Sequence, residues 1–595
     1  MSAADPARAN IDVDIVCVGF GPAAAGFLTT LAPHVENLES PTTPGMPLQV
    51  VCYERADDIG FGVSGAVTRA RGIPPAFLDP ARLPMSVAVR QERVAYLLDP
   101  IGASRRSFPL RVADRLLRPL ARHHAIEFPY IPSFLQKPGG MILSLGQLLQ
   151  QTGNELMASG AVQIWPGSPV SQALLSGDSD QPAVSGIRLA DQESLPGMDV
   201  HAPLTVVADG PVGAVGRQLD REFGLPSGHH TRDWALGMKA VVELPAGTEL
   251  ERGTVIHTFG YPEPEIFGFL YVLPENLVTV GIFVPSWFRS PVRTAYRYLQ
   301  HYMLHPYLWR HLEGGLLRSW GAKSLQESGK RGEPILAGDG FARIGESSGS
   351  TNVLTGSGVD EAWTTGSQLA TAVIEMLRQH QPFTRDNLHR AYIARRRGSW
   401  VEEEGRIAEK ARDGFHRGMV SGLIGMALAG FTKGKHFVSG EPKLMPSLQE
   451  YYAGRIPSEE VQRIIDDCRN RSVPCHDALM ERCGWPSIPF DGRLLISHQD
   501  ALLVGGKVQA PTGFADHVRF QFPDFCERCV SKLCIEMCSG QAITLGDGGI
   551  PVFDREKCVH CGACLWNCTA SLEDDPTGGN IAFSAGAGGL HSTEN

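Results

Sequence analysis

The spacing of hydrophobic residues divides the chain into a mixed α/β part and a part made mainly of strands. Apolar runs at 12–18 and 48–53 predict two strands, and helical periodicity follows at 23–35 and again at 359–377. Within residues 236–284, LGMKAVVEL, TVIHTFG, IFGFLYVL and LVTVGIFV are four strand-like runs separated by turn-rich stretches. Strands that alternate with helices favour a parallel sheet, whereas consecutive strands joined by short turns favour an antiparallel one.

A glycine-rich turn follows the first predicted strand and opens the first predicted helix. It reads GFGPAAAG, in which Gly19 permits the tight turn, Gly21 admits a diphosphate, and Ala24 packs helix on strand. The free N–H groups at a helix start favour an anionic ligand. The second predicted strand ends at Glu54 and Arg55, and an acidic residue there accepts hydrogen bonds from ribose. These residues predict a dinucleotide site, and the alternative is an ordinary strand–turn–helix unit.

Further patches favour FAD over NAD as the dinucleotide. The chain has no second glycine-rich fingerprint, so one dinucleotide is expected. A loop of small residues after the second strand allows close approach to a ring system. Two turns that pair glycine with an acidic residue, and a later glycine-rich turn, complete the pattern. The candidate cofactor-binding residues of these patches are Ser64, Gly65, Ala66, Asp209, Gly210, Gly338, Asp339, Gly356 and Gly358.

The order of these patches resembles the glutathione-reductase-type flavoproteins, which include p-hydroxybenzoate hydroxylase-like and geranylgeranyl reductase-like members. In that superfamily the aspartate of a Gly-Asp turn binds the ribityl chain, and the following helix points its N-terminus at the flavin. The resemblance implies these roles for Asp339 and for the segment from Gly356 to Gly358. It also implies that the antiparallel sheet covers the flavin ring and forms the substrate side.

Eight of the 13 cysteines lie close together near the C-terminus: Cys526, Cys529, Cys534, Cys538, Cys558, Cys561, Cys564 and Cys568. The second run has the bacterial ferredoxin spacing C-x2-C-x2-C-x3-C, whose thiolates hold a [4Fe–4S] cluster. The first run carries two extra residues in its middle gap. In two-cluster ferredoxins the fourth cysteine of each run ligates the cluster of the other run. We therefore expect Cys538 with the second run and Cys568 with the first, and two clusters. Zinc is the alternative, but it prefers two separated C-x2-C hooks.

Net charge, cysteine spacing and the search for targeting segments indicate where in the cell the protein is expected. The net charge of −10 gives no basic face for nucleic acid. Cysteines grouped at metal-ligand spacing indicate a reducing compartment. The N-terminal residues show no signal peptide, and no apolar run is long enough to span a bilayer. We expect the protein on the cytoplasmic side of a membrane, in peripheral contact at most.

Two apolar segments are candidates for that contact. Residues 128–135 predict an exposed apolar loop, and residues 418–431 form an apolar stretch flanked by basic residues. Basic flanks around an apolar stretch suit a helix lying in the membrane interface. A buried core helix whose glycines allow close packing is the alternative for 418–431.

The pattern predicts an α/β FAD-binding Rossmann-type fold with an inserted antiparallel α+β sheet domain and a C-terminal ferredoxin-like α+β domain. The expected boundaries are 1–235 and 331–470 for the FAD-binding domain, 236–330 for the sheet, and 471–595 for the ferredoxin-like domain. The sheet domain is expected to form the substrate or quinone side.

Most of the chain resembles electron-transfer flavoprotein:quinone oxidoreductase. The resemblance is carried by the GxGPA turn, VSGAV, LGQLL, ADGPVG, HTFGYP and CVHCGAC preceded by Cys538. It implies an enzyme that passes single electrons from reduced electron-transfer flavoprotein through one [4Fe–4S] cluster and FAD to a membrane quinone. The first cysteine run and Cys568 depart from that family, so a ferredoxin-like donor is also open.

No acid or base side chain is demanded by this scheme, so none is predicted as catalytic. Two other readings are open. One is a geranylgeranyl reductase-like flavoenzyme that saturates an apolar alkene with electrons from its own ferredoxin domain. The other is an electron-relay subunit of a larger complex.

Overall fold

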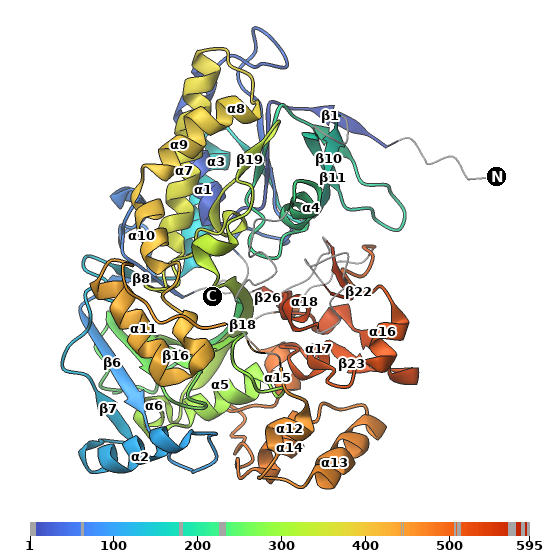
Figure 1. Cartoon of the computed structure of the whole chain (residues 1–595). Helices are drawn as coiled ribbons and strands as arrows, with labels where there is room; N and C mark the ends of the chain where they lie inside the picture. The colour runs from blue at the N-terminus through green and yellow to red at the C-terminus, as the bar shows by residue number, and fades with distance from the viewer. Residues whose placement is uncertain are drawn as a thin grey trace.

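The computed structural model shows two sheet-based halves and a C-terminal module beside them (Figure 1). It describes residues 8–60, 65–177, 182–224, 234–441, 443, 445–504, 507–508, 513–568, 579–584 and 590–591.

A six-stranded sheet forms the centre of the first half. Its order is β19 (Ala337–Gly338), β20 (Phe341–Arg343), β13 (Leu204–Val207), β2 (Ile15–Val18), β3 (Val50–Tyr53) and β9 (Gln163–Trp165). All neighbours are parallel except β19 and β20. The predicted strands at 12–18 and 48–53 are therefore present as β2 and β3, side by side.

Both faces of this sheet are covered, which explains why its strands read as unbroken apolar runs. Successive side chains of a strand point to opposite faces. Ile15 and Cys17 pack with α1 (Pro22–Leu31), α3 (Leu145–Ala158) and α7 (Val359–Arg378). Val16 and Val18 pack on the other side, against a smaller sheet and α4 (Ala214–Glu222). The smaller sheet is β1 (Asn10–Asp12), β12 (Asp199–His201), β11 (Ala183–Leu189) and β10 (Val170–Ser176).

A seven-stranded mixed sheet forms the second half. Its order is β18 (Leu316–Gln326), β14 (Trp234–Glu243), β17 (Leu277–Pro285), β16 (Phe267–Val272), β15 (Thr254–Phe259), β6 (Gln91–Leu97) and β7 (Ala125–Glu127). The four strand-like runs predicted in 236–284 are β14 to β17, and their mutual pairing is antiparallel. The structure adds β6 and β7 from upstream, and β6 pairs with β15 in parallel. A three-stranded sheet of β4 (Ala66–Thr68), β8 (Met141–Leu143) and β5 (Ser86–Ala88) lies nearby.

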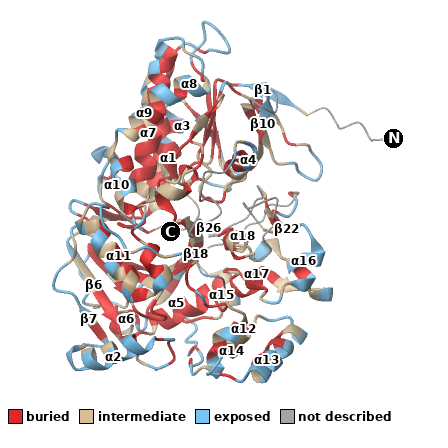
Figure 2. Cartoon of the chain, viewed as in Figure 1, coloured by how far each residue is buried: buried red, intermediate tan, exposed pale blue. Residues whose placement is uncertain are grey.

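One face of the seven-stranded sheet forms the largest core, and the other faces the first half. On β14, Leu236, Met238 and Ala240 pack with α5 (Ala295–Met303) and α6 (Pro306–Leu312), whereas Gly237 and Lys239 lie on the opposite face. Figure 2 shows α1, α7 and α5 as mostly buried. The same core includes residues from α12 (Leu448–Tyr452), α13 (Ser458–Asn470), α14 (His476–Arg482) and α15 (His498–Leu503). The predicted boundary at 470 thus falls inside a helical layer that packs on the second half.

The remaining helices connect these layers. They are α2 (Phe108–Leu117), α8 (Arg385–Leu388), α9 (Ala394–Arg397), α10 (Trp400–Ala408) and α11 (Met419–Phe431). Within the described parts of the chain, no helix is both long and apolar enough to cross a bilayer.

The C-terminal module is small and holds the clustered cysteines. Its helices are α16 (Pro523–Arg528), α17 (Leu533–Glu536) and α18 (Ala563–Asn567). Its strands form the antiparallel pairs β22 (Val518–Phe520) with β25 (Ile581–Phe583) and β23 (Ile543–Leu545) with β24 (Pro551–Phe553). A further pair joins β21 (Lys507–Val508) to β26 (Leu590–His591).

Candidate functional site

A cavity of about 690 Å³ lies between the carboxyl edge of the six-stranded sheet and the inner face of the seven-stranded sheet. Its volume is within the range of small-molecule and cofactor sites. Parallel α/β sheets bind their ligands at this edge, beyond the ends of the strands. The fold therefore places the cavity where the glycine-rich turn predicts a dinucleotide.

The glycine-rich turn forms one wall of the cavity. Gly19 has a φ of +87°, and a Cβ there would meet the Ala208 carbonyl oxygen at 2.8 Å, so only glycine fits. Gly21 caps the N-terminus of α1 and lines the cavity. Glu54 accepts hydrogen bonds from the N–H of Phe20 at 2.6 Å and of Ala56 at 2.9 Å, which fixes its carboxylate at the strand end. Ala24 is fully buried between helix and sheet and does not line the cavity, as expected of a packing position.

Asp209 lies beyond the carboxyl end of β13, on the other side of β2 from Glu54. One of its carboxylate oxygens is available to accept a hydrogen bond from a ligand. Burial raises its pKa to about 6, and it accepts a hydrogen bond from the N–H of Gly216 at 3.0 Å. Its Oδ1 is buried and has no partner among the described residues. Gly210 and Arg55 also line this part of the cavity, and burial lowers the pKa of the Arg55 guanidinium. A buried acceptor without a partner fits a donor from a ligand that the chain itself does not supply.

The structure corrects the placement of Gly338 and Asp339. Gly338 ends β19 and Asp339 begins the turn to β20, so both lie at the amino edge of β20, and neither lines the cavity. Asp339 instead accepts a hydrogen bond from the N–H of Arg385 at 2.7 Å. Because β20 runs parallel to β13, its carboxyl end lies after Arg343. A second pair of glycine and acidic residue, Gly345–Glu346, follows there and lines the cavity.

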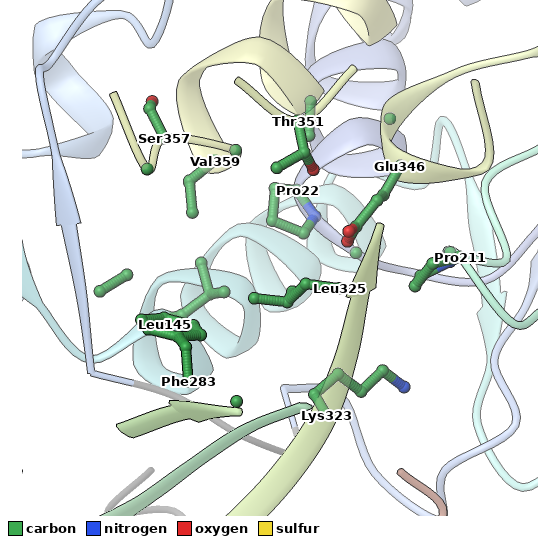
Figure 3. A pocket seen from close by; sticks show the side chains of 18 of the residues that line it. Pro22, Leu145, Pro211, Phe283, Lys323, Leu325, Glu346, Thr351, Ser357 and Val359 are labelled. Carbon is green, nitrogen blue, oxygen red and sulfur yellow. The ribbon is translucent and has the colours of Figure 1, made fainter. Parts of the chain in front are cut away.

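Glu346 and Lys323 lie on facing sides of the cavity (Figure 3). Burial raises the pKa of Glu346, and its Oε1 accepts a hydrogen bond from the N–H of Gln326 at 3.1 Å. Burial, and then the nearby charge of Arg55, lowers the pKa of Lys323 to about 8. This pair of opposite charges was not predicted from the sequence.

The predicted glycines before α7 do line the cavity. Gly356 has a φ of +66°, and Gly358 is the N-cap of α7, so the N-terminus of that helix opens on the cavity. Gly65 and Ala66 also line the cavity. Gly65 has a φ of +75°, and a Cβ there would lie 2.3 Å from Oγ1 of Thr279. Ser64 lies outside the described residues.

A buried lysine, Lys137, and a half-buried one, Lys239, also line the cavity, and sequence reasoning missed both. Lys239 donates a hydrogen bond to the Gly65 carbonyl at 3.2 Å, and burial lowers its pKa to about 7. Lys137 donates to the Thr355 carbonyl at 2.8 Å, and burial lowers its pKa to about 8. Cationic donors set in an otherwise apolar wall suit a ligand that becomes electron-rich. The sequence signal for Lys239 is a charged residue within an otherwise apolar strand, in which every second side chain faces the same side of the sheet.

The part of the cavity beside α11 is lined by apolar side chains and by Arg412, which lies over the ring of Phe267. Leu135, Leu423 and Met426 line this part, so both predicted apolar segments reach the cavity. One face of α11 is buried and the other exposes Val420, Ile424, Leu428 and Phe431.

A second exposed apolar stripe lies on α2 and its continuation, and was not predicted. It consists of four side chains spaced four residues apart, of which the first and the last two are more than 70% exposed: Phe108, Val112, Leu116 and Leu120. Exposed arginines follow on the adjacent side of the helix at Arg111, Arg115 and Arg118. At about 100° per residue the arginines border the stripe along one side. The regular spacing is readable in the sequence once the helix is known.

The eight clustered cysteines separate into two sets in space. Electrostatic interactions between thiols connect the members of each set, and Cys534 also interacts with Cys538 and Cys564, so the two sets adjoin. The outer set is Cys526, Cys529, Cys534 and Cys568, which line a small cavity of about 20 Å³. The inner set is Cys538, Cys558, Cys561 and Cys564. In the described ranges, no three or more His, Cys, Asp or Glu side chains are grouped as ligands of a metal ion.

Backbone and side-chain N–H groups donate to sulfur in both sets. In the outer set, Asn580 donates from its N–H to Cys568 and from its Nδ2 to Cys526, each at 3.3 Å. In the inner set, the N–H of Ala542 donates to Cys538 at 3.1 Å. Donors of this kind stabilise the thiolate form of cysteine, which is the form that binds metal.

The inner set adjoins the large cavity. Val559 and His560, which lie between two of its cysteines, are part of the cavity wall. The carbonyl of Cys561 accepts a hydrogen bond from the N–H of Ser324 on β18 at 2.9 Å. Gly562 packs so closely on Val212 that a Cβ would lie 2.8 Å from its Cγ1. The C-terminal module is thus docked directly on the elements that build the cavity.

The fold and the cavity define the class of protein: a two-domain, Rossmann-type flavoprotein whose described residues fit FAD. The fit rests on the glycine turn, the unpartnered oxygen of Asp209 and the helix N-termini at Gly21 and Gly358.

Comparison with known proteins agrees with this class. A family model described as "ETF-QO, ubiquinone-binding" matches residues 234–325. An electron transfer flavoprotein-ubiquinone oxidoreductase of Dictyostelium discoideum is 28% identical over 71% of this chain and 68% of that protein. The Pseudomonas aeruginosa enzyme of the same name is 26% identical over 67% of this chain and 69% of that protein. The predicted resemblance is confirmed, and the chain is an oxidoreductase related to the electron transfer flavoprotein-ubiquinone oxidoreductase family.

Solved structures are more distant. A geranylgeranyl bacteriochlorophyll reductase-like protein of Thermoplasma acidophilum is 14% identical, with a TM-score of 0.46 over 77% of this chain and 99% of that chain. The flavin-dependent brominase Bmp2 is 14% identical, with a TM-score of 0.45 over 78% of this chain and 100% of that chain.

Proposed function

We propose that the protein passes electrons one at a time from a soluble donor through two [4Fe–4S] clusters and FAD to a quinone. The donor is electron-transfer flavoprotein or a ferredoxin-like protein. The observation that carries the proposal is that the inner cysteine set adjoins the wall of the cavity that fits FAD, while apolar side chains of α11 line another part of that cavity. The names of the relatives and the ubiquinone-binding family model support the quinone as acceptor.

The two cysteine sets fit two clusters in a ferredoxin-like module. Each set takes three cysteines from one run and the fourth from the other, which is the interleaved pairing of two-cluster ferredoxins. A cluster is larger than a single ion, so its four ligands need not converge on one point. Asn580 and Ala542 would donate hydrogen bonds to the ligand sulfurs, and such bonds help set a cluster's potential.

The order of the two sets along the path follows from their positions. The inner set adjoins the large cavity through Val559 and His560, whereas the outer set lies beside Phe525, an exposed side chain that contacts the exposed ring of Phe522. We therefore place electron entry at the outer set. The outer set is also the feature by which this chain departs from the one-cluster pattern of the family. A donor different from that of the family would therefore dock at the outer set.

The chain's own residues bind, orient and shield the cofactor. Bound in the cavity, FAD supplies one- and two-electron chemistry, and the clusters supply one-electron transfer. Glu54 and Asp209 would hold the adenosine half, because they follow the carboxyl ends of β3 and β13, the strands on either side of β2. Lys239 and Lys137 each present an ammonium donor to the cavity near Gly65 and Thr355, where charge on a reduced ring would be stabilised.

The part of the cavity beside α11 would admit the quinone from a membrane. Leu423 and Met426 of α11 line that part, and the outer face of this helix exposes large hydrophobic side chains. The stripe on α2 and the exposed Phe128 and Tyr130 add to the same kind of surface. Apolar side chains bordered by arginines suit peripheral insertion among anionic lipids.

Iron analysis with two matched cysteine variants tests the scheme. The wild-type protein should contain about eight irons with matching acid-labile sulfide, as two [4Fe–4S] clusters require. Cys529→Ser should remove only the outer cluster and Cys561→Ser only the inner one, each leaving about four irons and a distinct EPR signal. Cys483→Ser, in a cysteine outside both sets, is the control. About four irons in the wild type, lost entirely in Cys561→Ser, would refute the second cluster.

A further inference from the structure

His560 stands out in the cavity wall because its side chain is buried but makes no hydrogen bond. It is 5% exposed, and neither ring nitrogen has a partner among the described residues. Leaving a buried polar group unsatisfied costs about 1–3 kcal/mol. Such groups persist where a ligand supplies the missing partner.

The surroundings of His560 hold its ring in place. The ring stacks on His517 at 4.5 Å between centroids and lies edge-on to Phe583 at 4.7 Å. Its backbone has a φ of +53°, which is unusual for a residue other than glycine. Backbone strain of this kind often marks a position that clamps a ligand. The ring is therefore fixed by packing and not by hydrogen bonds.

The side of the cavity that His560 faces carries two cationic residues, with Glu54 and Glu346 close to them. Arg55 and Lys323 are close enough to contribute to the electrostatic environment of the imidazole, and both line the same cavity. Two fixed cations and an imidazole form a natural site for a diphosphate or for the oxygens of a ribose. The glycine turn and Glu54 bring the adenosine diphosphate half of a dinucleotide to the same region.

We propose that His560 donates a hydrogen bond to the adenosine diphosphate half of FAD, so that the C-terminal module itself completes the dinucleotide site. This inference rests on the proposed function, since it assumes that FAD occupies the cavity. An imidazole always carries at least one N–H, so the donor is present in either tautomer. The backbone N–H of His560 donates to Cys558 at 3.3 Å, so one residue would contact both a cluster ligand and the flavin nucleotide.

The proposal has a reciprocal consequence. If FAD binding uses a residue of the module, then FAD must stabilise the docked module, and an intact module must strengthen FAD binding by the same factor. Protein purified without iron should therefore bind FAD more weakly than the complete protein.

The test measures the dissociation constant of FAD with full-length protein stripped of flavin but retaining iron. His560→Phe keeps a ring against His517 and removes both nitrogens, whereas His560→Gln restores an N–H donor. Glu556→Gln, in an exposed residue of the same loop that does not line the cavity, controls for disturbance of the loop. Iron content and the EPR spectrum are recorded on the same samples.

We expect about tenfold weaker FAD binding for His560→Phe, equivalent to about 1.4 kcal/mol, and recovery to within about threefold for His560→Gln. Glu556→Gln should bind as the wild type does. The inference is overturned if wild type and His560→Phe bind FAD with equal affinity. It is also overturned if His560→Phe loses iron and His560→Gln does not recover the affinity for FAD. A wild-type protein that binds no FAD would instead refute the proposed function.

Discussion

The stripe on α2 gives the most quantitative prediction for membrane contact. Leu116 and Leu120 expose 72% and 74% of their surface, so replacing both by serine removes apolar area without opening a cavity in the core. Full burial of a leucine side chain is worth about 2 kcal/mol. Three-quarters of that, for two residues, is about 3 kcal/mol. Since each 1.4 kcal/mol is tenfold, membrane partitioning should fall by about two orders of magnitude.

The assay is co-sedimentation with vesicles of phosphatidylcholine containing phosphatidylglycerol, under conditions where the bound fraction is proportional to lipid. Leu503→Ser is the matched control, because Leu503 is 83% exposed but lies on α15, away from α2. The control should partition like the wild type. The reasoning fails if the double variant partitions normally, or if Leu503→Ser loses as much.

Three further predictions follow from the site. Glu346→Ala should weaken FAD binding about tenfold, because it removes a hydrogen-bond acceptor from a charged pair in the cavity. Asp339→Ala should leave FAD binding unchanged. The reverse result would support the site at Gly338 and Asp339 that the sequence predicts. Gly562→Ala should loosen the docking of the module, because a Cβ would lie 2.8 Å from Val212, and limited proteolysis should release the module faster than from wild type. Lys239→Met should raise the melting temperature of flavin-free protein near pH 7. Because burial lowers the pKa of Lys239, the unfolded chain binds more protons than the folded protein between about pH 7 and 10.5. The stability of the wild type should therefore rise with pH across that window, and the stability of the variant should not.

The parts of the site that could be predicted are those whose signal is local. Gly19, Gly21 and Glu54 stand at fixed places in one strand–turn–helix–strand unit, so the sequence alone locates them at the sheet edge. The four strand-like runs and the turns between them likewise predict the sheet of β14 to β17. The interleaved grouping of the cysteines follows from their spacing.

Other parts depend on tertiary structure that no local pattern reveals. Gly338–Asp339 and Gly345–Glu346 look alike in sequence, and only the short strand β20 between them decides which pair reaches the cavity. Lys137, on a loop, and Lys239, on a strand, converge only after folding. The orientation of His560 depends on how the module docks on the rest of the chain.

The extent of the second half was also underestimated for a physical reason. β6 and β7 come from a stretch rich in proline and arginine, and they become strands because β15 offers a pairing edge. The helices between 448 and 503 are amphipathic, and their apolar faces identify a partner surface only once the sheet exists.

Single-turnover quinone reduction tests the central claim most directly. Holoprotein is reduced anaerobically with dithionite, freed of excess reductant and mixed with a short-chain ubiquinone in detergent, while flavin absorbance and quinol are followed. A flavin and two clusters store four electrons, so we expect about two quinols per protein, formed as the flavin reoxidises. Reduced flavin and clusters that persist in the presence of excess ubiquinone would contradict the account.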